Sequence, residues 1–211
     1  MTCANPAAGL CTAVAAAIPN LIDFDSATAP SPFVSGAATF SFSPGNVSPF
    51  VTGSVSGQYA APPNDQTRYL SIGSPGRAGS VIIDFSMPIN YYGLYFASAD
   101  AYNTFAFYET GNDITPLISF TGTQLSTALP GDQSTGQYIN FYINGGTVSR
   151  IVLSSTQAAL ETDNHSYVRA LGNDPSQVPE PATMGLMGGA LTGIALVLRR
   201  RNRKVFCGAA W

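Results

Sequence analysis

Residues 81–109 read VIIDFSMPINYYGLYFASADAYNTFAFYE, and this stretch decides the fold class. Bulky apolar residues alternate with other side chains at Ile83 and Phe85, and again at Phe105 and Phe107. A period of two residues is typical of a strand with one buried face, because successive side chains of a strand point to opposite sides of the sheet. The stretch therefore predicts β-strands.

The same pattern extends over residues 21–169, where β-branched and aromatic runs alternate with clusters of Gly, Pro, Asn, Asp and Ser. No run of ten or more of these residues has helical periodicity, so we expect an all-β domain, an antiparallel β-sandwich that is jelly-roll-like. The ten expected strands are residues 21–25, 37–43, 51–56, 69–73, 80–85, 91–97, 104–109, 117–121, 138–143 and 148–154.

Composition favours one such domain with appendages. Of the 211 residues, 45% are hydrophobic and only 10% are charged, while Gly and Pro supply 21 and 15 residues. The apolar fraction is large enough for a buried core, which disfavours a disordered chain, and the Gly and Pro content disfavours a helical bundle.

The C-terminal part has three components in a fixed order. Pro179, Glu180 and Pro181 come first, and an uncharged apolar segment, residues 182–198, follows. The third component is a basic cluster made of Arg199, Arg200, Arg201, Arg203 and Lys204. Seventeen helical residues span about 25 Å, which suffices for a single transmembrane helix when flanking Arg side chains snorkel. The positive-inside rule then leaves the β-sandwich outside the cytoplasm. Because the basic residues follow a membrane segment and do not cover a folded face, we expect no nucleic-acid partner.

This arrangement resembles the PEP-CTERM sorting signal of exosortase-dependent bacterial surface proteins. The resemblance implies that a membrane-embedded cysteine transpeptidase, the exosortase, recognises Pro179, Glu180 and Pro181 and cuts nearby. It also implies a precursor anchored in the inner membrane and a mature form at the cell surface or in the extracellular matrix. A simple tail anchor is the alternative.

The body of the chain also resembles a family, the exosortase-dependent surface proteins of cyanobacteria and proteobacteria, over residues 22–170. The resemblance rests on IDFDSATAP (22–30), SPFVTGSVSGQYAAPPNDQTRYLSIGSP (48–75), the stretch at 81–109 and VLSSTQAALETDNHSYVRA (152–170). It implies export and sorting, and it leaves the ligand of the body open.

The N-terminal residues allow three alternatives. Residues 7–18 read AAGLCTAVAAAI, which is similar to a secretory hydrophobic region, although no Lys or Arg precedes it. They form an intact signal peptide, the remnant of one that starts upstream, or a first strand or arm of the domain. Cys3 and Cys11 could pair in an oxidising compartment. The expected organisation is a leader (1–20), a β-sandwich (21–171), a linker (172–178), a sorting signal (179–204) and a short tail (205–211).

The body lacks recognisable catalytic motifs. His165 is its only histidine and is not accompanied by a G-x-S-x-G motif, so we expect it to be hydrogen-bonded in a loop near the domain end. Glu109 and Glu161 show no sign of sharing a cleft. We therefore predict a non-enzymatic structural or binding module, with exopolysaccharide as the candidate partner and aromatic rings in NYYGLYF (90–96) as candidate contacts. The alternative is a carbohydrate-binding or secreted hydrolytic domain with a tail anchor.

Acidic residues at both ends of the expected domain make a weak calcium hypothesis. Asp23 and Asp25 lie in the first expected strand, whereas Glu161, Asp163 and Asn164 lie near the end. The termini of jelly rolls often lie side by side, and Ca²⁺ prefers oxygen ligands. Solvated carboxylates or hydrogen bonds to loop N–H groups are the alternative. We expect no other cofactor, because no Cys or His spacing fits a zinc site.

Overall fold

A computed structural model of the chain describes residues 2–5, 10–12, 20–28, 32–46, 49–73, 78–96, 100–125, 132, 134 and 136–170. The chain divides into two units, residues 1–170 and 171–211, and every described residue belongs to the first unit. The predicted linker, sorting signal, transmembrane helix and short tail therefore lie outside the described residues.

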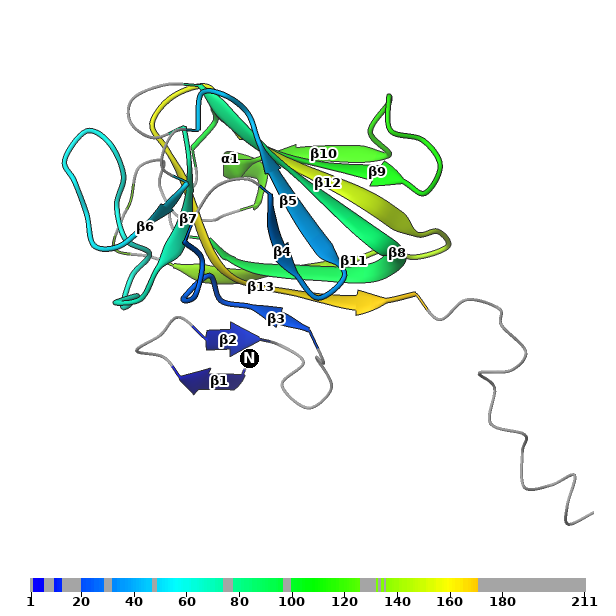
Figure 1. The fold of residues 1–211 in the computed structure, drawn as a ribbon, viewed down its shortest axis with the longest axis horizontal. Helices are drawn as coiled ribbons and strands as arrows, with labels where there is room; N and C mark the ends of the chain where they lie inside the picture. Colours follow the sequence, from blue (N-terminus) through cyan, green and yellow to red (C-terminus); the bar gives the residue numbers. More distant parts are fainter. Residues whose placement is uncertain are drawn as a thin grey trace, which may run out of the picture. The chain divides into compact units, whose positions relative to one another are not determined.

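One long strand, β8 (Gly79–Phe96), takes part in both layers of the β-sandwich (Figure 1). Its first half pairs with β5 (Ala38–Phe42) and β12 (Val148–Ser155). Its second half pairs with β11 (Gln137–Tyr142) and β13 (Leu160–Arg169). All four pairings are antiparallel, so the layers share a strand and form one continuous hydrogen-bonded network.

The remaining strands extend the two layers on either side. They are β3 (Leu21–Ile22), β4 (Phe33–Ser35), β6 (Phe50–Val51), β7 (Tyr69–Ile72), β9 (Asn103–Glu109) and β10 (Ile118–Thr121). One layer has the order β10-β9-β12-β8-β5-β4, and the other has β11-β8-β13-β7-β6 with β3 also paired to β13. In the described part of the chain the only helix is α1 (Gly122–Leu125), so the prediction of a mainly antiparallel β-sandwich is confirmed.

The structure corrects the expected strands at three places in the chain. The two strands expected at 80–85 and 91–97 are one strand, because β8 continues through Pro88, where the register of the neighbouring strands shifts and the missing proline N–H is tolerated. The strand expected at 51–56 ends at Val51, and residues 52–68 form a loop. The strand β13 replaces the loop expected around His165.

The described N-terminal residues form a separate two-stranded sheet. Strands β1 (Thr2–Asn5) and β2 (Leu10–Thr12) are antiparallel, and their register places the backbone of Cys3 opposite that of Cys11. This pairing fits the alternative of a strand or arm, while a disulfide between the two cysteines stays a prediction.

The core lies between the layers and is rich in aromatic residues. The alternating residues singled out in the sequence, Ile83, Phe85, Phe105 and Phe107, are all buried. A second aromatic group surrounds Phe24, whose ring centroid lies 5.5–5.6 Å from those of three other phenylalanines and 4.9 Å from that of a histidine. These neighbours are Phe33, Phe40, Phe50 and His165. The contacts join the segment that follows β3 to β4, β5, β6 and β13.

Candidate functional site

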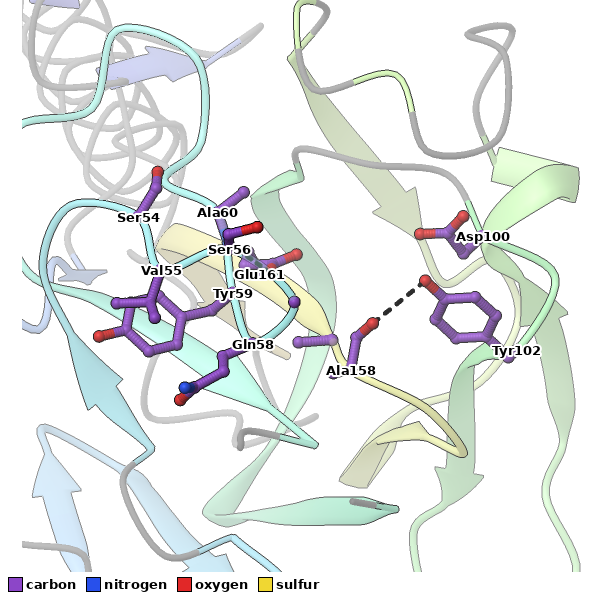
Figure 2. A pocket seen from close by; sticks show the side chains of 12 residues that line it. Ser54, Val55, Ser56, Gln58, Tyr59, Ala60, Asp100, Tyr102, Ala158 and Glu161 are labelled. Carbon is purple, nitrogen blue, oxygen red and sulfur yellow. Dashed lines mark hydrogen bonds between the residues drawn. The ribbon is translucent and has the colours of Figure 1, made fainter. Parts of the chain in front are cut away.

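A pocket of about 410 Å³ opens beside the beginning of β13 (Figure 2). Three segments form its walls: the loop tip at residues 54–60, the turn that precedes β9, and the residues that enter β13. The side chains that line it are those of Ser54, Val55, Ser56, Gln58, Tyr59, Ala60, Asp100, Tyr102, Ala158, Ala159 and Glu161, together with the backbone of Gly57.

Local hydrogen bonds shape the loop tip. The Val55 N–H donates to the Tyr59 carbonyl at 2.9 Å, and the Gln58 N–H donates to the Val55 carbonyl at 3.0 Å. Between them Gly57 has a φ of +73°, a left-handed conformation that glycine adopts without a steric penalty. The tip therefore folds back on itself, and Tyr59 at its end is one of the residues that line the pocket.

Buried polar side chains attach this loop to the sheet. The Tyr69 hydroxyl, in β7, donates a hydrogen bond of 2.6 Å to the Gly53 carbonyl. In the neighbouring strand β13, the Glu161 carboxylate accepts the Ala60 N–H through Oε1 at 2.9 Å. Two adjacent strands thus hold the two sides of the loop tip, and Glu161 serves both the loop and the pocket.

The environment of Glu161 is unusual for a carboxylate. The residue is only 2% exposed, and within the described structure its buried Oε2 has no hydrogen-bond partner. The pKa of Glu161 is raised to about 7, mainly by burial; the hydrogen bond from the Ala60 N–H opposes this shift, and the nearby charge of Asp100 adds to it. At neutral pH this group therefore exchanges between its charged and neutral forms.

Asp100 and Tyr102 lie across the pocket from Glu161 (Figure 2). Asp100 is buried, and the Tyr102 hydroxyl interacts with it and also donates a long hydrogen bond of 3.4 Å to the Ala158 carbonyl. Burial, followed by this interaction with Asp100, raises the pKa of the Tyr102 hydroxyl. None of the described residues that line the pocket is Lys, Arg or His, so the charge that these residues contribute comes from carboxyl groups.

A second carboxyl pair lies farther along β13. Asp163 is fully buried and accepts a hydrogen bond from the Asn164 side chain at 2.7 Å, and Asp65 accepts two from Thr67. Burial, and then the Asp65 charge, raise the pKa of Asp163 to about 10. Asp163 is therefore protonated at neutral pH, and its interaction with Asp65 links the loop that carries Asp65 to β13.

The structure separates the four calcium candidates. Strands β3 and β13 pair as the hypothesis requires, and Asp163 lies close enough to Asp25 to feel its charge. Asp23 is exposed and its Oδ1 accepts the Asp25 N–H at 3.3 Å, whereas Glu161 belongs to the pocket. Within the described ranges, no three His, Cys, Asp or Glu side chains form a group that could hold a metal ion.

His165 lies on a strand inside the core, so the expectation of a loop histidine is wrong. It is fully buried, with Nδ1 2.7 Å from the Tyr92 hydroxyl and Nε2 2.9 Å from the Thr162 hydroxyl. Burial lowers its pKa to about 3. A neutral histidine with both nitrogens paired inside the core is a structural residue.

The aromatic residues of NYYGLYF are buried as well. Tyr91, Tyr92, Tyr95 and Phe96 are at most 6% exposed. The Tyr91 hydroxyl donates to the Asn140 side chain at 2.8 Å, and the Tyr95 hydroxyl donates to a loop carbonyl at 2.9 Å. The half-buried residues Tyr59 and Tyr102 line the pocket instead, and no sequence pattern distinguishes them from other tyrosines.

A second cavity, of about 440 Å³, lies between β10 and β11 and is mostly apolar. Phe107, Phe120 and Phe141 line it, and their rings lie 4.6–6.4 Å from one another. Leu117 and Ile118 at its rim are about half exposed. The described residues that line it include no Asp, Glu, Lys, Arg or His. We therefore take the pocket beside β13, here called the acidic pocket, as the candidate functional site.

Comparison with known protein families identifies the sorting signal. The PEP-CTERM protein-sorting motif matches residues 177–201, which include Pro179, Glu180 and Pro181. The chain thus carries a PEP-CTERM sorting signal, the mark of an exported protein that is processed or anchored at the membrane and then associated with the cell surface. The match does not extend to residues 22–170, so the family resemblance of the body stays a prediction.

Comparison with solved structures finds carbohydrate-binding modules. One is a family 6 carbohydrate-binding module, which is 15% identical, covers 62% of this chain and 95% of its own, and has a TM-score of 0.35. Another is the low-affinity xylan-binding module CBM86 from Roseburia intestinalis, with 13% identity, 65% and 98% coverage and a TM-score of 0.31. A comparison with curated proteins finds no match.

Among the described residues no helix is long and apolar enough to cross a bilayer. The segment predicted to span it, residues 182–198, lies outside them.

Proposed function

We propose that this protein is an exported bacterial surface protein that an exosortase sorts and cleaves close to Pro179, Glu180 and Pro181. Before cleavage, residues 182–198 anchor the precursor in the inner membrane, with Arg199 and the rest of the basic cluster in the cytoplasm. After cleavage the β-sandwich reaches the cell surface or extracellular matrix, where it binds polysaccharide without hydrolysing it.

The sorting signal supports the first half of this proposal. The matched residues 177–201 contain the motif, the whole apolar segment and the first three arginines of the basic cluster. Pro179 and Pro181 disfavour helix, which keeps the peptide bonds around Glu180 extended and accessible to a protease.

Mass spectrometry of the surface-released protein tests the sorting step. In cells that express an exosortase, the mature protein should lack residues 184–198, and replacement of Pro179, Glu180 and Pro181 by alanine should retain them. A wild-type protein that keeps the 184–198 peptide in those cells would contradict cleavage and support a simple tail anchor.

The acidic pocket supports the second half. Binding sites for polar ligands combine apolar or aromatic walls with a few polar groups that fix orientation. Here the rings of Tyr59 and Tyr102 lie at one concave site with the carboxyl groups of Asp100 and Glu161 and the exposed amide of Gln58. Rings that stack on sugar faces and acceptors for sugar hydroxyls suit a polysaccharide.

The same carboxyl pair favours glycoside hydrolysis as a second candidate function, because glycosidases use two carboxyl groups and raise the pKa of the acid. Against it, Oε1 of Glu161 is occupied by the Ala60 N–H, and Oε2 is shielded from solvent. A general acid needs an oxygen within reach of the scissile bond. We therefore assign Glu161 to loop attachment and to the charge of the pocket, which acts on a ligand without direct contact to either oxygen.

A glycan array probed with the full chain, solubilised in a detergent without a sugar head group, tests binding. Tyr59→Ala should lose binding, whereas Tyr142→Ala should keep it, since Tyr142 is 58% exposed and lies outside the pocket. The same glycans are then assayed for new reducing ends. Hydrolysis that Glu161→Gln abolishes would replace our proposal with an enzymatic one.

A further inference from the structure

The described residues that line the acidic pocket carry more acidic than basic groups. Glu161 and Asp100 contribute two carboxyl groups, and none of the described lining residues is Lys, Arg or His. The charge of Asp100 raises the pKa of Glu161. A ligand that enters therefore meets two carboxyl groups on the described walls of the pocket.

The Glu161 carboxyl group also lacks part of its hydrogen bonding. It is 98% buried, because only 2% of the residue is exposed, and Oε2 lacks a partner among the described residues. In Figure 2 its carboxyl group extends from β13 towards the side of the pocket that carries Asp100 and Tyr102. Buried polar atoms without partners are rare in proteins and each one calls for an explanation.

We propose that the pocket selects glycans with free amino groups, such as de-N-acetylated hexosamine residues, whose ammonium group is held near Glu161 and Asp100. This inference rests on the proposed polysaccharide-binding function and names the class of sugar that the site prefers.

The carboxyl groups of the pocket should bind neutral, acidic and amino sugars with different affinities. A neutral sugar can offer its hydroxyl groups to the carboxylates but gains no charge interaction. A uronic acid or sulfated sugar is repelled by both Glu161 and Asp100. An ammonium group gains a favourable interaction with each carboxylate, and the effective dielectric is lower in a pocket than in bulk water. The expected order of affinity is amino sugar, then neutral sugar, then acidic sugar.

The binding of a cation should also release a proton. Glu161 titrates near pH 7, so at about pH 6 its neutral form predominates. A bound ammonium group favours the charged carboxylate and lowers this pKa, and the proton leaves to the buffer. Asp100, Tyr69 and Tyr102 are the other titratable groups that interact with Glu161, and the raised pKa values of both tyrosines keep them neutral at this pH.

Calorimetry on the full chain in a detergent without a sugar head group tests the inference at about pH 6. The probes are a glucosamine oligomer, its N-acetylated form, a neutral glucose oligomer and a uronic acid oligomer of the same length. Each titration is repeated in buffers with different ionisation enthalpies. We expect the glucosamine oligomer to bind about tenfold more tightly than the neutral oligomers, with proton release, and the uronic acid oligomer to bind least.

Variants connect the result to the pocket. Glu161→Gln should abolish the proton release and most of the preference for the amino sugar, and Asp100→Asn should weaken the preference. Glu109→Gln is the matched control, because Glu109 is exposed and lies outside the pocket.

The outcomes separate the two proposals. If neutral oligomers bind as tightly as glucosamine and no proton is released, the inference is overturned and polysaccharide binding stands. Proton release that persists in Glu161→Gln also overturns it. If no glycan binds, polysaccharide binding and the inference fail together.

Discussion

Tyr92 and His165 form a hydrogen-bonded pair at the centre of the β-sandwich, with the Tyr92 hydroxyl oxygen 2.7 Å from His165 Nδ1. Both side chains are fully buried, and their rings pack edge to face at 5.6 Å. Tyr92 comes from β8 and His165 from β13, so the pair joins the two strands that make the largest contact in the domain. A polar pair in this position is stable because each group satisfies the other.

Tyr92→Phe should therefore destabilise the domain by about 1–2 kcal/mol, because it leaves a ring nitrogen of His165 buried without a partner. Urea unfolding followed by circular dichroism measures the loss. Tyr142→Phe is the control, since Tyr142 is 58% exposed and should change the free energy of unfolding by less than about 0.5 kcal/mol. Equal stability of the two variants would show that the buried pair contributes nothing.

Strand β13 differs from the strands that the sequence pattern predicts. The alternation of Phe105 and Phe107 with Thr104 and Ala106 in the sequence predicts strands such as β9, because every second residue is bulky and apolar. In β13 the eight residues 160–167 are all buried, and six consecutive ones are polar or charged, a composition typical of loops. These residues are buried because loop 52–68 covers one side of the strand and the core covers the other.

The pocket could not be predicted for a related reason. Asp100 and Glu161 are far apart in sequence, and they meet only because loop 52–68, the turn before β9 and the start of β13 lie together. No sequence pattern indicates a cleft at Glu161, and none distinguishes Tyr59 or Tyr102 from the other tyrosines. The one available signal was the polar run at 161–166 between Leu160 and Tyr167, because apolar residues at both ends of a polar run can indicate a buried strand.

The raised pKa of Glu161 predicts a specific dependence of stability on pH. Its folded pKa of about 7 lies above the ordinary value of 4.5, so the folded state holds a proton that the unfolded state has lost. The contribution of Glu161 to stability therefore falls as the pH rises from 4.5 to about 7, and it stays low above that range.

Glu161→Gln removes this titration and retains an oxygen that can accept the Ala60 N–H. We expect the variant and the wild type to be about equally stable at about pH 4, and the variant to be more stable by up to about 3 kcal/mol at about pH 8. Comparison of the two proteins at each pH isolates Glu161 from His165, whose lowered pKa acts in the opposite direction. A stability difference that does not change with pH would contradict the assigned environment of Glu161.

Gly36 should be intolerant of substitution. It lies in the two-residue turn between β4 and β5 with a φ of +59°, and a Cβ there would lie 2.6 Å from the Tyr167 hydroxyl. That hydroxyl accepts the Ala37 N–H at 2.8 Å, so Tyr167 cannot move away without breaking a buried hydrogen bond.

Gly36→Ala should cost about 2–4 kcal/mol, from the left-handed backbone and the clash together. Gly111→Ala is the matched control, because Gly111 also has a positive φ, of 88°, but a Cβ there meets nothing within 4 Å. Thermal unfolding should show the larger loss for Gly36→Ala. Equal losses would mean that the turn, and not the contact with Tyr167, sets the requirement for glycine.

The Asp65 and Asp163 pair predicts the pH at which Ca²⁺ would change the melting temperature of the domain. Oδ2 of Asp65 and Oδ1 of Asp163 are both buried, the two carboxyl groups interact with each other, and carboxylate oxygens are ligands that Ca²⁺ prefers. The pKa of Asp163 is about 10, so a cation has to displace a proton at neutral pH, and no third acidic residue completes a metal site here among the described residues. If Ca²⁺ binds at this pair, it should raise the melting temperature more at about pH 9 than at about pH 6, by mass action on the native state. Asp163→Asn should remove the effect, and Glu109→Gln, at an exposed carboxylate elsewhere, should preserve it.

The contradicting outcome is a set of melting curves, recorded at matched ionic strength, that are the same with Ca²⁺ and with a chelator at both pH values. Such curves would eliminate calcium binding and leave a shared proton as the only link between Asp65 and Asp163.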